Sequence, residues 1–219
     1  GYAFVPFGQR AEITIINTCT VTQRADFQSR QMVRRAFRSN PNSLIIATGC
    51  YPQVEPDAFL KMEGVRYLLG NGEKNQIPDL LPLMQQGEFP RVQVGDIQME
   101  MSFSEIPLHS FRRHTRAFLK IQDGCNSYCS YCIVPHARGR SRSLLPERVV
   151  ESLKVLKEKG FKEVVLTGIH LGAYGQDLNP PCSLEKLINH IEKGETPDRI
   201  RLSSIEPLEF SPGLISFRM

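Results

Sequence analysis

The three cysteines Cys125, Cys129 and Cys132 are the residues of this chain whose type and spacing best indicate a chemistry. Their C-x₃-C-x₂-C spacing puts three thiols on one short loop, and thiolates are the usual ligands of iron–sulfur clusters. Three thiolates can hold three irons of a [4Fe–4S] cluster, which leaves the fourth iron open to another molecule. A ferredoxin needs a fourth cysteine, and a zinc ribbon usually needs a second CxxC pair; neither is near this loop. The spacing therefore favours an open iron–sulfur cluster over the alternative, a structural zinc site.

Two further cysteines each follow a predicted strand. Cys19 comes just after an apolar, β-branched stretch at residues 12–17, and Cys50 comes just after another at 44–48. The carboxyl ends of parallel strands meet at the crevice where α/β sheets place their ligands. We therefore expect these two thiols to converge on a shared metal or cluster; the alternative is two unrelated buried thiols.

The elements that must position these cysteines alternate between strand and helix. Hydrophobic patterning predicts strands at 12–17, 44–48, 65–69 and near Val92, and helices at 23–38, 56–62 and 73–85. Such alternation implies a parallel sheet covered by helices. Residues 1–95 are therefore predicted to form a Rossmann-like parallel α/β domain, followed by a linker at 96–114.

Residues 115–219 are predicted to begin a (β/α) barrel. Strands are expected at 115–122, 162–167 and 199–203, and helices at 146–159 and 184–192. The cysteine triplet follows the first of these strands, at the end of the barrel that carries the chemistry in such folds. The chain lacks an initiating Met and stops without a closing element, so we expect both the N-terminal domain and the barrel to be truncated.

The composition is that of an ordinary soluble globular protein, with 41% hydrophobic and 23% charged residues among 219. No apolar run approaches the roughly 18 residues that cross a bilayer, so no membrane partner is predicted. Six cysteines, three of them clustered, suit metal binding in the reducing cytoplasm better than disulfides.

The net charge of +4 permits a nucleic-acid partner. Its basic clusters are Arg30, Arg34, Arg35 and Arg38, then Arg112, Arg113 and Arg116, then Arg138, Arg140 and Arg142, and the first could equally be a solvated helix face.

Several motifs together resemble the methylthiotransferases, radical S-adenosylmethionine (SAM) enzymes that install a methylthio group. The resemblance rests on Asn17-Thr18-Cys19-Thr20-Val21-Thr22, Thr48-Gly49-Cys50, and the triplet continuing as Ile133-Val134-Pro135. It implies that Cys125, Cys129 and Cys132 are the catalytic cysteines, whose cluster binds SAM and generates a 5′-deoxyadenosyl radical. It also implies a second [4Fe–4S] cluster, so that the full-length enzyme has two. Cys19 and Cys50 match two of its three ligands, and the third normally lies upstream of this chain's first residue.

The same resemblance assigns residues to the SAM site. Tyr131 stands where the superfamily packs an aromatic ring against the SAM adenine, and Thr167-Gly168 where its backbone approaches the methionine portion. Glycine allows that approach sterically. Ser204 and Glu206 belong to the family's next segment facing the cofactor.

Other polar residues carry weaker expectations. His136 and His170 are expected to be packed or hydrogen-bonded rather than metal ligands, and Cys182 to be a structural thiol. The segment Arg138-Gly139-Arg140 either faces SAM or substrate, or makes structural ion pairs.

Within the family, Ala25–Arg30 and Leu166–Gly175 resemble the branch that modifies N6-threonylcarbamoyladenosine at position 37 of tRNA. This implies a transferase whose partners are the tRNA anticodon loop and an electron donor such as a flavodoxin or ferredoxin. A single-stranded loop suits such an enzyme because its bases can be splayed out. The alternatives are a methylthiotransferase acting on another tRNA adenosine or on a ribosomal protein side chain, and a non-enzymatic zinc- or redox-binding RNA module.

Overall fold

A computed structural model describes residues 2–105 and 115–216, which form two compact units. The first unit comprises residues 1–100 and 128–139, and the second comprises 101–127 and 140–219. The chain therefore passes from the second unit to the first between Ser127 and Tyr128, inside the cysteine triplet. The predicted linker at 96–114 falls partly outside the described residues, which omit 106–114.

The first unit is built on a four-stranded, wholly parallel sheet in the order β1-β2-β3-β4. Its strands are β1 (Ile13–Thr18), β2 (Leu44–Gly49), β3 (Val65–Leu69) and β4 (Val92–Gln93). The α-helices of this unit are α1 (Gln23–Ser39), α2 (Cys50–Val54), α3 (Pro56–Leu60), α4 (Ile77–Gln86) and α5 (Val134–Arg138). Two 3₁₀ turns, η1 (Lys74–Gln76) and η2 (Ile97–Met99), complete it. The predicted Rossmann-like α/β arrangement is confirmed.

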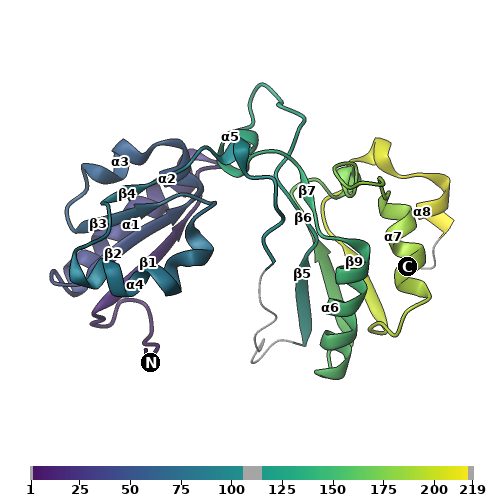
Figure 1. The fold of residues 1–219 in the computed structure, drawn as a ribbon, viewed down its shortest axis with the longest axis horizontal. Helices are drawn as coiled ribbons and strands as arrows, with labels where there is room; N and C mark the ends of the chain where they lie inside the picture. The colour runs from purple at the N-terminus through teal and green to yellow at the C-terminus, as the bar shows by residue number, and fades with distance from the viewer. Residues whose placement is uncertain (1, 106–114, 217–219) are drawn as a thin grey trace. The chain divides into compact units, whose positions relative to one another are not determined.

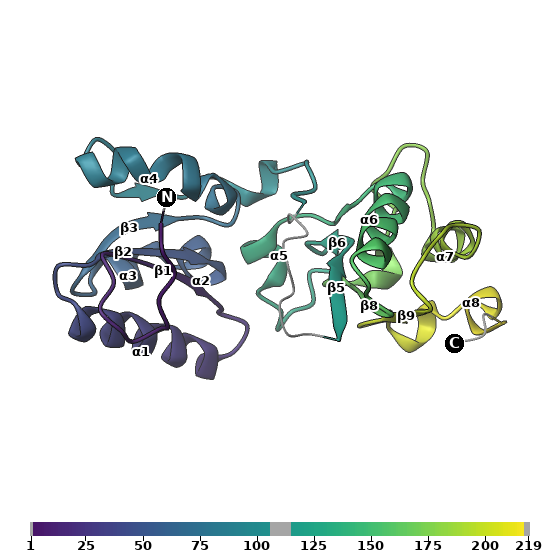
Figure 2. The same ribbon diagram turned by 90° about the horizontal axis from the view of Figure 1, so that it is seen from below.

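Helices cover both faces of this sheet, as Figure 2 shows for α1 and α4. On one face, Val33 of α1 and Phe59 of α3 are fully buried against the strands. On the other, Leu81 and Met84 of α4 pack on β2 and β3. A sheet buried on both faces needs apolar residues at successive positions, which explains why β2 reads as a continuous apolar run rather than an alternating one.

Two helix predictions in this unit need correction. The sequence predicted a helix only from residue 56, whereas α2 already begins at Cys50, directly after β2. The single helix predicted at 73–85 is a 3₁₀ turn followed by α4, which begins with Ile77 and Pro78. Proline is favoured in the first turn of a helix, where its missing N–H costs no hydrogen bond, so Pro78 fits the start of a new helix here.

The second unit has a three-stranded parallel sheet in the order β5-β8-β9 (Figure 2), and Figure 1 labels its outer strands β5 and β9. The strands are β5 (Arg116–Lys120), β8 (Glu163–Thr167) and β9 (Arg199–Leu202), with a short antiparallel pair formed by β6 (Gln122–Asp123) and β7 (Arg142–Ser143). The α-helices are α6 (Pro146–Glu158), α7 (Leu184–Glu192) and α8 (Pro212–Ser216), and the 3₁₀ turns are η3 (Leu171–Ala173) and η4 (Pro207–Glu209). This is the repeating strand–helix pattern predicted for the start of a (β/α) barrel.

One apolar core holds the second unit together. Leu153 and Leu156 of α6 and Leu187 of α7 are fully buried with Val164 and Leu166 of β8. Among the described residues, no helix is both long enough and apolar enough to span a bilayer.

Candidate functional site

The register of β1 and β2 sets Cys19 and Cys50 at matching positions. Thr18 is paired with Gly49, and each cysteine is the next residue along its own strand. Gly49 has a φ of +101°, and a Cβ at this position would lie 2.4 Å from the carbonyl oxygen of Thr18. Only glycine combines this backbone conformation with so close an approach between the strands. The chain can therefore turn into α2 and present Cys50 beside the end of β1.

Ser29 of α1 holds the backbone of Cys19. Its buried hydroxyl donates to the carbonyl oxygen of Cys19 at 3.1 Å and accepts from the Cys19 N–H at 3.4 Å. The Cys19 residue itself is exposed. The loop after β1 is thus anchored to a helix while leaving its thiol accessible.

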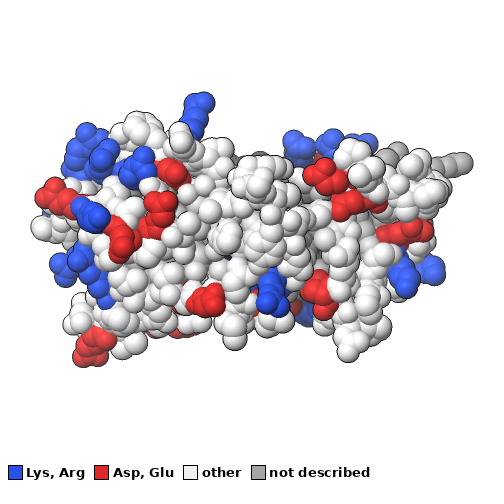
Figure 3. Space-filling model, turned by 90° about the horizontal axis from the view of Figure 1, so that it is seen from above, with Lys and Arg blue, Asp and Glu red and all other residues white. Residues whose placement is uncertain are grey.

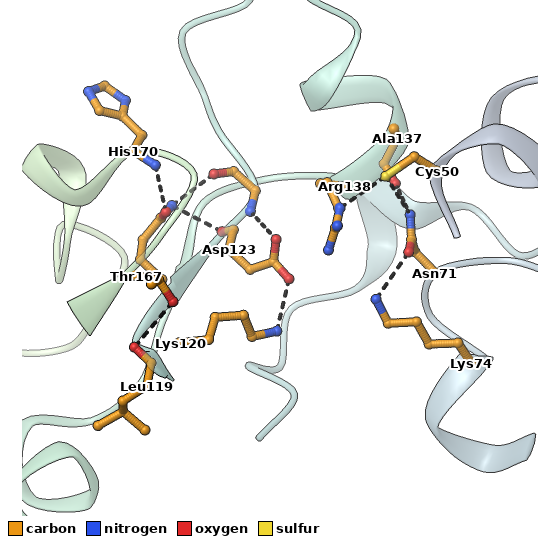
Figure 4. Close-up of polar contacts among 12 residues, drawn as sticks. Cys50, Asn71, Lys74, Leu119, Lys120, Asp123, Ala137, Arg138, Thr167 and His170 are labelled. Carbon is orange, nitrogen blue, oxygen red and sulfur yellow. Dashed lines mark hydrogen bonds and ion pairs between the residues drawn. The ribbon is translucent and has the colours of Figure 1, made fainter. Parts of the chain in front are cut away.

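Two donors meet the buried sulfur of Cys50 (Figure 4). The Nε of Arg138 lies 3.1 Å from the Cys50 Sγ, and the Nδ2 of Asn71 lies 3.6 Å from it. Asn71 also donates to the carbonyl oxygen of Ala137 at 2.6 Å, and its Oδ1 accepts from Lys74 at 3.2 Å. These contacts join α5 to the start of α2 and place two N–H donors at the Cys50 sulfur.

Cys125, the first cysteine of the triplet, lies in the second unit and has two hydrogen-bond partners. The N–H of Ser127 donates to its Sγ at 3.4 Å, and the Nδ1 of His170 lies 3.7 Å away. Partial burial by itself raises the pKa of the Cys125 thiol, but the hydrogen bonds from Ser127 and His170 outweigh it, so the net pKa is lowered. A thiolate is the form that ligates metals.

Cys129 and Cys132 lie in the first unit, where the Cys132 N–H donates to the Cys129 carbonyl oxygen at 2.9 Å. Just before them, Tyr128 has a φ of +44° and donates from its hydroxyl to Gln98 at 3.0 Å. Tyr131 has 90% of its surface exposed. Its predicted contact with the SAM adenine stays a prediction.

Gln122 connects the strand before the triplet to the loop after β8, and sequence reasoning missed it. Its amide is fully buried. The Nε2 donates to the Gly124 carbonyl oxygen at 2.8 Å and to the Ser141 Oγ at 3.0 Å, while the Oε1 accepts from the His170 N–H at 2.8 Å. The backbone that leads into Cys125 is thereby held against the predicted cofactor segment.

Thr167 and Gly168 lie at the end of β8, as predicted. The Thr167 hydroxyl donates to the Leu119 carbonyl oxygen at 3.3 Å (Figure 4). A Cβ on Gly168 would come within 2.9 Å of both the Gln122 Oε1 and the Leu171 Cδ2. Protein packing alone therefore requires glycine here. Its predicted contact with SAM remains a prediction.

The segment after β9 carries Ser204 and Glu206, both exposed. The Ser204 carbonyl oxygen accepts from the Leu171 N–H at 3.3 Å, which ties this segment to η3. The neighbouring Ser203 has a buried Oγ without a hydrogen-bond partner among the described residues. Ser203 is a second residue that the sequence did not single out.

The two histidines were expected to be packed or hydrogen-bonded. The His136 ring lies edge-on to Tyr128, with the ring centroids 6.0 Å apart. His170 is hydrogen-bonded through its Nε2 to Glu209 at 2.5 Å, in addition to its contact with Cys125.

Burial raises the pKa of the Cys182 thiol, which disfavours the thiolate at this position.

Basic and acidic side chains are interspersed on the face shown in Figure 3. On α1, the guanidinium of Arg30 donates to the Tyr51 hydroxyl and lies over its ring, and that of Arg35 lies over Phe7. Arg34, Arg35 and Arg38 are exposed, and Arg30 is half-buried. The first predicted basic cluster is therefore mostly exposed, although Arg30 and Arg35 also lie over aromatic rings. In the other two clusters, Arg112 and Arg113 fall outside the described residues.

The cysteine chemistry fits iron–sulfur ligation. None of the six cysteines forms a disulfide, and Cys125, whose pKa is lowered, heads a triplet of the required spacing. Within residues 2–105 and 115–216, no three His, Cys, Asp or Glu side chains are gathered so that they could hold one metal ion. The fit therefore rests on ligand type, spacing and thiolate stabilisation.

Two protein families match separate parts of the chain. Residues 1–70 match the family described as UPF0004, and residues 119–205 match the Radical SAM superfamily. A radical SAM methyltransferase, TsrM from Kitasatospora setae, has a similar fold, with a TM-score of 0.54 and 18% identity over 85% of this chain and 42% of that one. The predicted α/β fold class is confirmed, and the part of the chain predicted to begin a radical SAM barrel contains the residues that match that superfamily.

Curated relatives match almost the whole chain. The threonylcarbamoyladenosine tRNA methylthiotransferases MtaB of Bacillus subtilis and Aquifex aeolicus are each 39% identical over 98% of it, which corresponds to 48% and 52% of their own lengths. A tRNA-2-methylthio-N(6)-dimethylallyladenosine synthase of Moorella thermoacetica is 31% identical over 99% of the chain and 50% of its own length. The chain thus spans about half the length of these relatives.

Proposed function

We propose that this chain, which contains a UPF0004 domain followed by a radical SAM domain, is part of an enzyme that adds a methylthio group to N6-threonylcarbamoyladenosine at position 37 of tRNA. The main support is the co-occurrence of two cysteine sets in one chain, the triplet at 125–132 and the Cys19–Cys50 pair set by the β1–β2 register. Sulfur insertion at an unactivated ring carbon needs both a radical initiator and a sulfur source. The identity to tRNA methylthiotransferases supports the choice of substrate.

Cys125, Cys129 and Cys132 would hold one [4Fe–4S] cluster. When bound, such a cluster supplies the electron that cleaves SAM and yields a carbon-centred radical. The protein contributes a stabilised thiolate at Cys125 and an exposed aromatic ring at Tyr131. Thr167, Gly168, Ser204 and Glu206 would border the SAM, on segments that Gln122 and the Leu171–Ser204 hydrogen bond hold in place.

Cys19 and Cys50 would contribute two ligands to a second cluster. Arg138 and Asn71 would hold the Cys50 sulfur in place through their hydrogen bonds to it. Arg138 lies six positions after Cys132, the last cysteine of the triplet. A residue that follows the triplet therefore contacts Cys50, which belongs to the Cys19–Cys50 pair. The exposed Arg34 and Arg38 of α1 are available to contact tRNA phosphates.

The substrate assignment is tested in a strain that lacks the full-length gene. Nucleosides from its tRNA are measured by mass spectrometry after complementation with the wild type or with Cys125→Ala, Cys129→Ala or Cys132→Ala. The wild type should restore 2-methylthio-N6-threonylcarbamoyladenosine and each variant should abolish it. Cys182→Ala is the matched control and should retain it, because Cys182 is not a proposed ligand.

The same experiment separates the alternatives. Restoration of the methylthio derivative of dimethylallyladenosine alone would favour the substrate named for the Moorella thermoacetica relative. An unchanged set of tRNA nucleosides would exclude tRNA modification and favour a protein substrate. Zinc without iron or labile sulfide after anaerobic purification would instead favour a non-enzymatic metal-binding module.

A further inference from the structure

We propose that His170 and Glu209 form a positioning pair that donates a hydrogen bond to the Cys125 sulfur and raises the reduction potential of the cluster which this thiolate would ligate. The inference rests on the proposed role of the triplet. It adds a role for two residues that are themselves neither cluster ligands nor SAM contacts.

The imidazole of His170 lies between two acceptors. Its Nδ1 is 3.7 Å from the Cys125 Sγ, and its Nε2 is 2.5 Å from the Glu209 Oε1. A thiolate accepts hydrogen bonds, so the Nδ1 that faces the Cys125 sulfur is the donor in this contact. Only 21% of the His170 side chain and 25% of the Glu209 side chain are exposed, so water screens the interaction less than at an open surface.

Two hydrogen bonds hold the backbone around His170 in place. The His170 N–H donates to the fully buried Gln122 side chain at 2.8 Å. The next residue, Leu171, donates its N–H to the Ser204 carbonyl oxygen at 3.3 Å. The ring is therefore carried on a segment with little freedom to move away from Cys125.

Glu209 is fixed as well. Its Oε2 accepts from the Glu206 N–H at 3.1 Å, which leaves Oε1 directed at His170. Gly172 lies against this carboxylate, and a Cβ there would come within 1.8 Å of Oε2. The glycine thus makes room for a carboxylate that reaches the imidazole from 39 positions along the chain.

A hydrogen bond to a ligating sulfur affects a cluster in a known direction. It withdraws charge from the sulfur and stabilises the more negative, reduced form, which makes the potential more positive. Loss of the His170 donor should therefore make the cluster harder to reduce.

The test measures the midpoint potential of the triplet cluster by EPR-monitored redox titration. The full-length protein is reconstituted anaerobically in a Cys19→Ala, Cys50→Ala background, so that the triplet cluster dominates the signal. Relative to this background, His170→Ala should shift the potential to a more negative value with iron and sulfide content unchanged. Glu209→Gln should shift it less in the same direction, and His170→Gln, which retains a donor, should recover part of the loss.

His190→Asn is the matched control, because His190 is exposed on α7 and its Nδ1 contacts the Lys186 carbonyl oxygen. If His170→Ala has the potential of this control, the positioning role is overturned while the function of the triplet stands. If His170→Ala fails to assemble a cluster, Glu209→Gln decides, and an unshifted potential there overturns the pair. Absence of any cluster in the Cys19→Ala, Cys50→Ala parent would overturn both the pair and the proposed triplet cluster.

Discussion

At the scale of single residues, the candidate site depends on buried polar side chains that hold other residues in place. The side-chain nitrogen of Gln122 donates to Gly124 and Ser141, and its oxygen accepts from His170. In the first unit, the side-chain nitrogen of Asn71 donates to the Ala137 carbonyl oxygen and to the Cys50 sulfur. Buried amides of this kind stabilise a particular geometry because any displacement leaves several groups unsatisfied.

Replacement of Gln122 by Leu should lower the free energy of unfolding by about 1–3 kcal/mol, since it leaves the buried partners of the amide without a hydrogen bond. Gln176→Leu makes the same chemical change at an exposed position and should alter stability by less than about 0.5 kcal/mol. Denaturant titration measures both. Equal stability of the two variants would show that the Gln122 hydrogen bonds contribute nothing.

At the scale of elements, the β1–β2 register decides where Cys19 and Cys50 lie. The pairing Thr18↔Gly49 sets the two cysteines level, and α2 begins immediately, so Cys50 is buried while Cys19 is exposed. The close contact at Gly49 is what permits this turn.

Gly49→Ala should therefore destabilise the protein more than Gly87→Ala. Both glycines have positive φ, at +101° and +79°. A left-handed non-glycine residue costs roughly 1–2 kcal/mol by itself. At Gly49 the new Cβ would also meet the Thr18 backbone, whereas nothing lies within 4 Å at Gly87. Thermal unfolding checks the order, and a larger loss for Gly87→Ala would contradict the argument.

At the scale of the whole molecule, each unit has its own apolar core. The core of the second unit includes Leu153, and that of the first includes Phe59; both side chains are fully buried. Truncation of a buried side chain costs its transfer energy and leaves a cavity.

Leu153→Ala should cost about 2–5 kcal/mol and Phe59→Ala about 3–5 kcal/mol, each within its own unit. Hydrogen exchange followed by mass spectrometry resolves the location. Leu153→Ala should speed exchange in α6 and β8 and leave α1 and β2 unchanged, and Phe59→Ala should do the reverse. Faster exchange across both units in either variant would show that the cores are not independent.

The local patterns were sufficient to predict most of the architecture. Apolar runs located the strands of both sheets, because burial on two faces leaves a clear signal in consecutive residues. They failed at α2 and η1, which are too short for a periodic pattern to emerge. The sequence also did not predict that residues 128–139 belong to the first unit while the residues before and after them belong to the second. This assignment depends on which unit the segment packs against.

The sequence by itself determined which side chains could ligate a cluster. Cys125, Cys129 and Cys132 lie within eight residues, and their type and spacing can be read without knowledge of the fold. Only the tertiary structure decided what surrounds them. The contact of His170 with both Cys125 and Glu209, and that of Arg138 with Cys50, join residues 39 to 88 positions apart. Such pairs carry no periodic signal in the sequence, because they are created when the strands and loops pack.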